Sequence, residues 1–358
     1  MKSILLATAD RNMLPPLTEQ IPAPMLPLAD RPAIVYAIEC MVRQGIKEIV
    51  IALHHQSSVI DGFLGSGERW NAQFSFLLQR EFLGSAGSLK RAEQQLTETF
   101  LVLPADALID LDIDAALAFH RANKSMATVI VSPLPTPTGV DHAQADAATQ
   151  ADCGMVALDA LNRVFALAPK GDVAGDQPFY CSTGAYIFEP EVLSYIPANT
   201  ATDCYADLLP VLLDEGLPVF GFRMDGYWNP LDSFPAYQAA QAALLKPDDT
   251  PQGNNPTLPL ALRNRYIEAH EIQPGIWIGP RSKVHPTAQI TPPVLIGASC
   301  RIGRDVEIGP NVVIGAGTVL DSGATVRTST ILAGTYVGQM VLVDNRIVHR
   351  ALLTDAGT

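Results

Sequence analysis

The feature that most constrains the fold of this chain is a six-residue repeat in its last third. An aliphatic residue stands at every sixth position, ten times without a miss: Ile278, Val284, Ile290, Ile296, Ile302, Ile308, Ile314, Leu320, Val326 and Leu332. The fourth residue after each is small or β-branched from Ser282 to Thr330. This period predicts a triangular β-helix with the aliphatic residues stacked inside and small residues at its corners. Its flat faces suit association, so we expect an oligomer.

The first two thirds of the chain have a different pattern. Short apolar runs such as "SILLA", "IKEIVIAL" and "FLVLPA" alternate with longer helical patterns. The segment "RPAIVYAIECMVRQG" has Pro32 near its start and Gly45 at its end, as expected of a helix between two strands. This alternation predicts an α/β domain with a mostly parallel sheet, whose ligands bind at the carboxyl ends of the strands.

These patterns predict the domain boundaries. The α/β domain is expected over residues 1–245, because a stretch rich in Pro, Asp, Asn and Gly follows. Residues 246–274 are then a linker, residues 275–338 the β-helix and residues 339–358 a C-terminal tail.

Charge and cysteine content exclude several classes of protein. The formal net charge of −13 repels a polyanion, so nucleic acid is not an expected partner. Apolar runs are too short for a membrane span or a signal peptide, and we expect a cytoplasmic protein. The five cysteines are scattered, which predicts buried thiols and neither a disulfide framework nor a zinc site.

Several motifs resemble those of the sugar-1-phosphate nucleotidyltransferases, the nucleotide-sugar pyrophosphorylases. "ATADRNMLPPLT" and "PAPMLP" align without gaps with the family's A-G-G-x-G-T-R-L-x-P-L-T and P-K-P-x-L-P. "LGSAGSL" matches L-G-T-A-G-A-L, and "VLPADALID" stands where the family has its G-D magnesium motif. The resemblance implies a Rossmann-like (GT-A-like) domain followed by a left-handed β-helix. The family converts a nucleoside triphosphate and a sugar 1-phosphate, with magnesium, to a nucleotide-sugar and pyrophosphate.

The resemblance divides the site positions into kept and lost ones. Residual nucleotide- or sugar-binding positions are Leu6, Ala7, Gly84, Ser85, Ala86, Gly87, Asp106, Gly154, Ser182 and Gly184. Of these, Asp106 corresponds to a metal carboxylate, here vestigial. The lost positions, which carry glycines or charged residues in the family, are Thr8, Ala9, Arg11, Met13, Ala23, Leu167, Ala168 and Pro230. We therefore assign no catalytic residue.

Loss of phosphate-binding amides and of cations predicts a pseudoenzyme. The leading interpretation is a regulatory or scaffold subunit that binds a nucleotide-sugar, as a homo-oligomer or with an active paralogue through the β-helix. No cofactor is expected, except magnesium if activity is retained. Two alternatives stay open: an active enzyme with relocated catalytic groups, and a structural oligomerisation protein. For Gly84 and Gly87 a purely structural reading also stays open, because a tight strand-to-helix turn needs the same residues.

Overall fold

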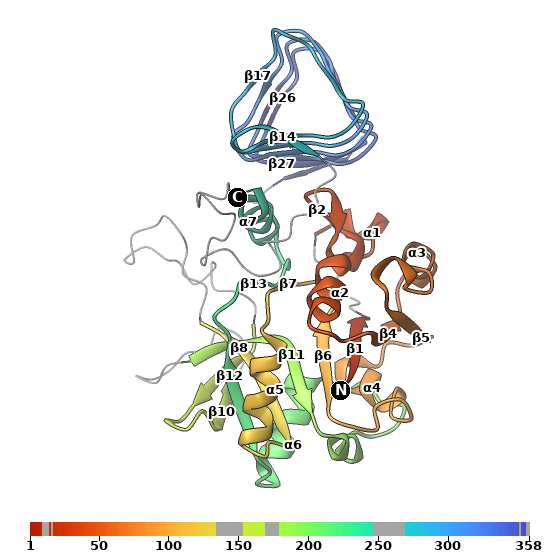
Figure 1. Ribbon diagram of the computed structural model, residues 1–358, viewed down its shortest axis with the longest axis vertical. Helices are drawn as coiled ribbons and strands as arrows, with labels where there is room; N and C mark the ends of the chain where they lie inside the picture. The colour runs from red at the N-terminus through yellow and green to blue at the C-terminus, as the bar shows by residue number, and fades with distance from the viewer. Residues whose placement is uncertain are drawn as a thin grey trace. The chain divides into compact units, whose positions relative to one another are not determined.

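The computed structural model describes residues 1–8, 14–15, 17–133, 153–168, 179–245, 269–350 and 352–355 (Figure 1). The chain divides into two compact units. Unit 1 comprises Met1–Asp10 and Tyr36–Pro230, and unit 2 comprises Arg11–Val35 and Leu231–Thr358. No helix among the described residues is long and apolar enough to cross a membrane.

Unit 1 is built on a mixed sheet of nine strands, in which β10, β9, β11, β6, β1, β4 and β5 lie in that order. One half is parallel: β6 (Phe100–Pro104), β1 (Lys2–Ala7), β4 (Glu48–Leu53) and β5 (Gln73–Leu78). Helices connect the strands: α2 (Ala33–Arg43), α3 (Ser57–Leu64), α4 (Gly84–Arg91), α5 (Ile113–Ala122) and α6 (Leu209–Asp214). The expected α/β domain with a mostly parallel sheet is confirmed.

Antiparallel pairs complete the sheet around β11 (Phe179–Phe188). This strand pairs with β6, with β8 (Ala127–Ser132) and with β9 (Met155–Leu158). At the two margins, β10 (Val164–Ala168) pairs with β9 and β12 (Val219–Arg223) runs parallel to β8. The register of β11 shifts between Ser182 and Tyr186, where Gly184 has a φ of 77°. Glycine suits this irregularity because a side chain is strained at positive φ.

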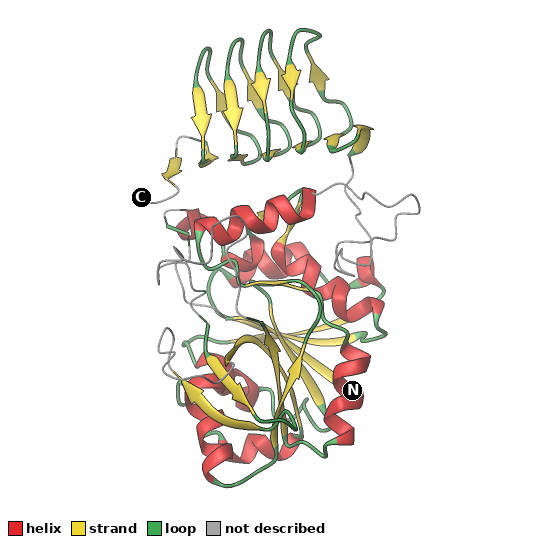
Figure 2. Ribbon diagram, turned by 90° about the vertical axis from the view of Figure 1, so that its left-hand side faces the viewer, coloured by secondary structure: helices red, strands yellow, loops and turns green. Residues whose placement is uncertain are grey.

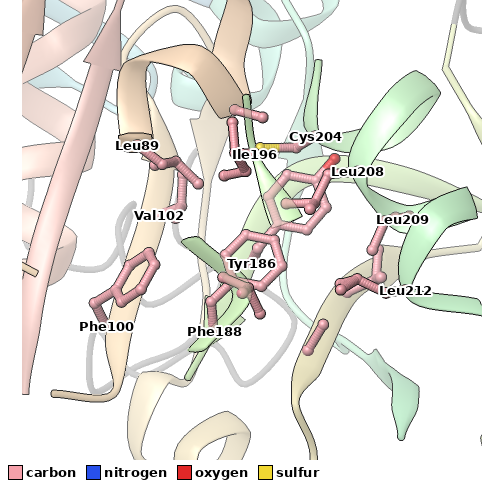
Figure 3. Close-up of a cluster of buried hydrophobic side chains, with 14 of the residues drawn as sticks. Leu89, Phe100, Val102, Tyr186, Phe188, Ile196, Cys204, Leu208, Leu209 and Leu212 are labelled. Atoms are coloured by element: carbon pink, nitrogen blue, oxygen red, sulfur yellow. The ribbon is translucent and has the colours of Figure 1, made fainter. Parts of the chain in front are cut away.

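The main core of unit 1 lies between this sheet and the elements that follow β11. Tyr186 and Phe188 stack with ring centroids 5.2 Å apart, and residues of α4, of α6 and of a single π-helical turn, η5 (Cys204–Leu208), pack around them (Figure 3). Short helical segments among the described residues include η2 (Glu68–Trp70) and η4 (Pro190–Tyr195) in unit 1, and α1 (Leu17–Gln20) and η1 (Ala23–Met25) in unit 2. Burial of large apolar side chains is the main stabilising contribution here.

Two of the five cysteines differ from the expectation of free thiols. Cys153 and Cys181 form a disulfide, with Cα atoms 5.5 Å apart. Cys181 pairs with Met155 in the register of β9 and β11, and Cys153 lies two residues before the start of β9, so the bridge joins two cysteines that are 28 residues apart in sequence. Cys40, Cys204 and Cys300 are free and buried, as expected. Scattered spacing could not reveal the pair because the fold, and not the sequence distance, brings the two strands together.

The repeat region of unit 2 forms the expected β-helix, whose successive coils are stacked in Figure 2. Its three sheets each take one strand per coil, and sheet one also includes β14 (His270–Gln273) and β28 (Leu352–Asp355), which pair antiparallel with β15 (Ile276–Ile278) and β27 (Arg346–His349). The parallel strands of sheet one are β15, β18 (Val294–Ile296), β21 (Val312–Ile314), β24 (Thr330–Ile331) and β27. Sheet two contains β16 (Lys283–Val284), β19 (Arg301–Ile302), β22 (Val319–Leu320) and β25 (Tyr336–Val337). Sheet three contains β17 (Gln289–Ile290), β20 (Glu307–Ile308), β23 (Thr325–Arg327) and β26 (Leu342–Asp344).

The register of the β-helix corrects the last hexad. Ile314 pairs with Ile331 and not with Leu332, so the coil that ends there is one residue shorter. Ile331 belongs to the stacked core, which continues through Val337, Val343 and Val348. The tenth position was therefore wrong, because an aliphatic neighbour at Leu332 hides the phase shift.

One of the three flat faces of the β-helix is already covered within unit 2. The outward residues of sheet one, Trp277, Leu295, Val313, Thr330 and Ile347, are buried. Helix α7 (Phe234–Leu245) reaches this region, because Gln238 Nε2 donates to Thr328 O at 2.7 Å. Tyr237 of α7 also bonds to Pro27 O of a short hairpin, β2 (Pro27–Leu28) and β3 (Arg31–Pro32). On sheets two and three the outward residues of the first coils are exposed and polar: Lys283, Arg301, Gln289 and Glu307.

Candidate functional site

The turn that resembles the family's L-G-T-A-G motif starts helix α4 in unit 1. Gly84 has a φ of 70°, and a Cβ there would lie 2.4 Å from Thr202 O. The backbone N–H groups of Ala86 and Gly87 donate to the same oxygen at 2.9 and 3.1 Å. Both glycines are therefore required by close backbone packing. The structural reading of this motif is sufficient for Gly84 and Gly87.

Ser85 connects the turn to the segment that follows Thr202. Its Oγ donates to Asp203 Oδ2 at 2.7 Å and accepts from the backbone N–H of Cys204 at 2.7 Å. Asp203 Oδ1 in turn accepts from the N–H groups of Tyr205 and Ala206. The hydroxyl of Ser85 is thus engaged in holding two elements together.

The positions expected on the sugar side lie on β9, β10 and β11. Ser182 donates its backbone N–H to Gly154 O at 2.8 Å, so these two residues are direct neighbours. Ser182 Oγ lies 3.4 Å from Tyr186 Oη, and both side chains are buried. Gly184 follows in the irregular part of β11, where the nearest atom to an added Cβ is Pro104 Cγ at 3.7 Å. The structure therefore brings Gly154, Ser182 and Gly184 together.

Leu6, Ala7 and Asp106 lie at the carboxyl ends of two neighbouring parallel strands. Leu6 pairs with Pro104, and its carbonyl accepts the N–H of Ala105 at 2.9 Å. Asp106 follows directly and is half-buried, in the turn before β7 (Leu108–Ile109). This is the edge at which ligands of parallel sheets bind.

The position of the family's second metal carboxylate is occupied by Pro230. Strand β7 pairs antiparallel with β13 (Trp228–Asn229), and Asn229 lies opposite Leu108. Continuing this register brings Pro230 alongside the residue that follows Asp106. Among the described residues no cluster of three or more His, Cys, Asp or Glu side chains could hold a metal ion. A single carboxylate beside a proline does not fit a magnesium site with two carboxylate ligands.

The other lost positions carry no charge where the structure describes them. Thr8 follows β1 and is buried, and Ala23 is buried in η1. Leu167 and Ala168 end β10, pair with Val156 and Met155, and are half-buried. Ala9, Arg11 and Met13 lie outside the described residues.

Gln79 is a candidate that the sequence motifs did not reveal. Its side chain directly follows β5 and is 3% exposed, and its Nε2 is buried without a hydrogen-bond partner among the described residues. Ser88 Oγ lies 3.3 Å from Gln79 Oε1 but only 2.6 Å from Gly84 O. The single hydroxyl proton of Ser88 is therefore donated to Gly84 O. In either orientation of the amide, one polar atom has no partner within the part of the chain that the structure describes. The only sequence signal is a polar residue that ends an apolar strand five positions before Gly84.

Comparisons with known proteins agree with this architecture. A family model described as "Nucleotidyl transferase" matches residues 2–247, and one described as "GMPPB C-terminal domain" matches residues 290–352. A UTP–glucose-1-phosphate uridylyltransferase of Synechocystis sp. is 29% identical over 291 residues, which are 78% of this chain and 69% of that protein. The catalytic subunit beta of a mannose-1-phosphate guanylyltransferase of Danio rerio is 26% identical over 234 residues. That match covers 64% of this chain and 60% of the relative's length.

Solved structures share the fold. A putative glucose-1-phosphate thymidylyltransferase from Bacillus anthracis, in complex with sucrose, superposes with a TM-score of 0.57 at 21% identity and covers 68% of this chain and 94% of its own. HddC from Yersinia pseudotuberculosis, complexed with GMP-PN, gives 0.54 at 19% identity, covering 67% and 97%. Because the first family model covers more than half of the chain, this protein belongs to the sugar-1-phosphate nucleotidyltransferase family and carries a GMPPB-like C-terminal β-helix domain.

Proposed function

We propose that this chain is a family member that has lost pyrophosphorylase catalysis and serves as a nucleotide-sugar-binding regulatory or scaffold subunit. The observation that carries the proposal is the pairing of β7 with β13, which puts Pro230 beside the segment of Asp106. Proline offers no side-chain oxygen as a metal ligand.

The chemistry of nucleotidyl transfer explains why these losses matter. Such reactions depend mostly on positioning and on electrostatic stabilisation of phosphate oxygens. The positions that carry lysine or carboxylate in the family are Ala23, Leu167, Ala168 and Pro230 here. Removal of one preorganised group typically costs about 10² to 10³ in rate. Several such losses together leave too little stabilisation for turnover.

Retention of ligand binding is supported by Gln79. An unpaired buried amide atom destabilises the folded protein by about 1 to 3 kcal/mol unless a partner is supplied. The amide of Gln79 lies 3.3 Å from Ser88 Oγ of α4, and the turn that starts α4 lines the nucleobase and sugar pocket in the family by resemblance. Nucleobase edges carry both donors and acceptors, so they suit the unpaired atom in either orientation of the amide.

Two measurements on the full chain test the proposal. Pyrophosphate release is measured with UTP plus glucose 1-phosphate and with GTP plus mannose 1-phosphate, both with magnesium, and we expect none. Thermal shift is measured with UDP-glucose and GDP-mannose, with magnesium or with EDTA, and we expect a magnesium-independent rise in melting temperature.

A variant of Gln79 sharpens the second measurement. Gln79→Met keeps the side-chain length and removes the unpaired polar atom, so the ligand-free protein should be at least as stable as the wild type. The same variant should lose the shift with the nucleotide-sugar. Turnover above roughly 1 per second would instead establish an active enzyme. Absence of any shift in the wild type would leave the structural oligomerisation protein as the function.

A further inference from the structure

The segment 202–205 contacts both halves of the candidate site within unit 1. Thr202 O accepts the N–H groups of the α4 turn, and Asp203 accepts the hydroxyl of Ser85. Tyr205, at the end of the same segment, contacts β9 and β10, where the sugar-side positions lie. No motif of the sequence drew attention to this segment.

The ring of Tyr205 packs directly against Gly154. A Cβ added to Gly154 would lie 2.4 Å from Cζ of Tyr205 and 2.5 Å from Cε1 and Cε2. A real side chain cannot approach so closely, so the ring leaves room only for glycine. The presence of glycine at position 154 is therefore explained by Tyr205.

The hydroxyl of Tyr205 joins the ends of two strands. Tyr205 Oη lies 2.7 Å from Met155 O and 2.7 Å from Ala168 O, and its single proton is shared between them. Met155 and Ala168 are opposite each other in the register of β9 and β10. Burial raises the pKa of Tyr205 to about 12, so the hydroxyl keeps its proton at neutral pH. The group therefore fixes where β10 ends relative to β9.

The position of Tyr205 is itself fixed from the other half of the site. Asp203 caps the single π-helical turn η5 by accepting the N–H of Tyr205 at 2.8 Å, while its second oxygen accepts from Ser85. Isolated π turns in helical segments occur frequently at functional sites. The α4 turn and the β9–β10 strands are thus held at a set spacing by one short segment.

We propose that Tyr205 is a positioning residue for the sugar-binding half of the site, which sets Gly154 and the end of β10 at the spacing that a nucleotide-bound sugar requires. This inference rests on the proposed function, because it needs a nucleotide-sugar as the ligand. Tyr205 touches no reacting atom in this role. It acts through the backbone of Gly154, Met155 and Ala168.

The test compares two ligands that differ only by the sugar. Affinities of the full chain are measured by calorimetry for UDP-glucose against UDP and for GDP-mannose against GDP. Tyr205→Phe keeps the ring over Gly154 and removes the hydroxyl. We expect the Kd of the nucleotide-sugar to rise about tenfold and the Kd of the nucleoside diphosphate to change less than about twofold.

Two further variants make the test specific. Tyr195→Phe is the matched control, because Tyr195 packs partly buried against the same core and is not part of the site. It should leave both affinities unchanged. Gly154→Ala places a methyl group against the ring of Tyr205 and should reproduce the selective loss of sugar affinity. Melting temperatures report whether each variant is folded.

The outcomes separate this inference from the proposed function. If the wild type binds nucleotide-sugars but Tyr205→Phe weakens both ligands equally, or neither, Tyr205 has only a structural role and the proposed function stands. If the wild type binds none of the four ligands, the proposed function and the positioning role both fail. A selective loss in Tyr205→Phe and Gly154→Ala, absent from Tyr195→Phe, supports the proposal.

Discussion

His120 Nε2 lies 3.1 Å from Glu189 Oε1, and its Nδ1 lies 2.8 Å from Thr128 Oγ1, in a side chain that is 1% exposed. Burial is the main cause that lowers the pKa of His120 below its ordinary value of 6.5, and Glu189 opposes this effect in part. The imidazole of His120 therefore binds a proton more weakly in the folded protein than in the unfolded chain, where its pKa is higher.

This relationship predicts a loss of stability in mild acid. The contribution of His120 is fully present above pH 6.5 and decreases as the pH falls, because the unfolded state binds the proton first. Between pH 7.5 and pH 5.5 the free energy of unfolding, measured by urea denaturation, should fall less in His120→Gln than in the wild type. His285→Gln, which changes a histidine that bonds locally to Thr287, is the control. Identical slopes for wild type and both variants would contradict the prediction.

The disulfide between Cys153 and Cys181 predicts a response to reductant. Closing a loop in the unfolded chain typically stabilises a protein by about 2 to 4 kcal/mol. We expect dithiothreitol to lower the urea midpoint of the wild type, and the double variant Cys153→Ser/Cys181→Ser to be insensitive to it. Cys300→Ser, which changes a free thiol, should respond like the wild type. An unchanged midpoint of the wild type under reduction would show that the bridge does not form in solution.

Pro230 lies beside the segment that carries Asp106, and we predict that one substitution there restores a second metal carboxylate. Pro230→Asp should lower the Kd for Mn²⁺ by about tenfold or more, because a second carboxylate then stands beside the segment that carries Asp106. Pro230→Asn, of similar size but without charge, is the control and should gain little. Asp106→Asn in the Pro230→Asp protein should remove the gain. If Pro230→Asp and Pro230→Asn bind Mn²⁺ equally, the two positions do not form a pair.

We predict that the chain associates with a second copy through the last coil of its β-helix. Tyr336, Met340 and Leu342 are 62%, 81% and 65% exposed, and within the described chain sheets two and three end at β25 and β26. Apolar side chains on open strand edges favour pairing with a second copy. Leu342→Glu should therefore lower the oligomeric mass in light scattering. Thr325→Glu lies one coil earlier in the same column and should not. Equal masses for the two variants would place the interface elsewhere.

The sequence by itself determined the architecture. A period of six over nine positions leaves no regular structure other than a coil with three short strands, because each of these aliphatic residues must face the same core. Apolar runs that alternate with helical patterns likewise determined the α/β domain. The motif "LGSAGSL" located the start of α4 because the turn there needs glycine at Gly84, which has positive φ.

Only the tertiary structure decided which partners these residues have. The coil shortened by one residue at Ile331 is invisible because its neighbour Leu332 is also aliphatic. The disulfide, the unpaired amide of Gln79 and the packing of Tyr205 on Gly154 depend on segments far apart in the chain. A residue's type determines which contacts it can make, whereas satisfaction of a buried hydrogen bond or bridging of two thiols depends on distances of a few ångströms. Those distances are set by how the strands pack, and no local pattern of residues encodes them.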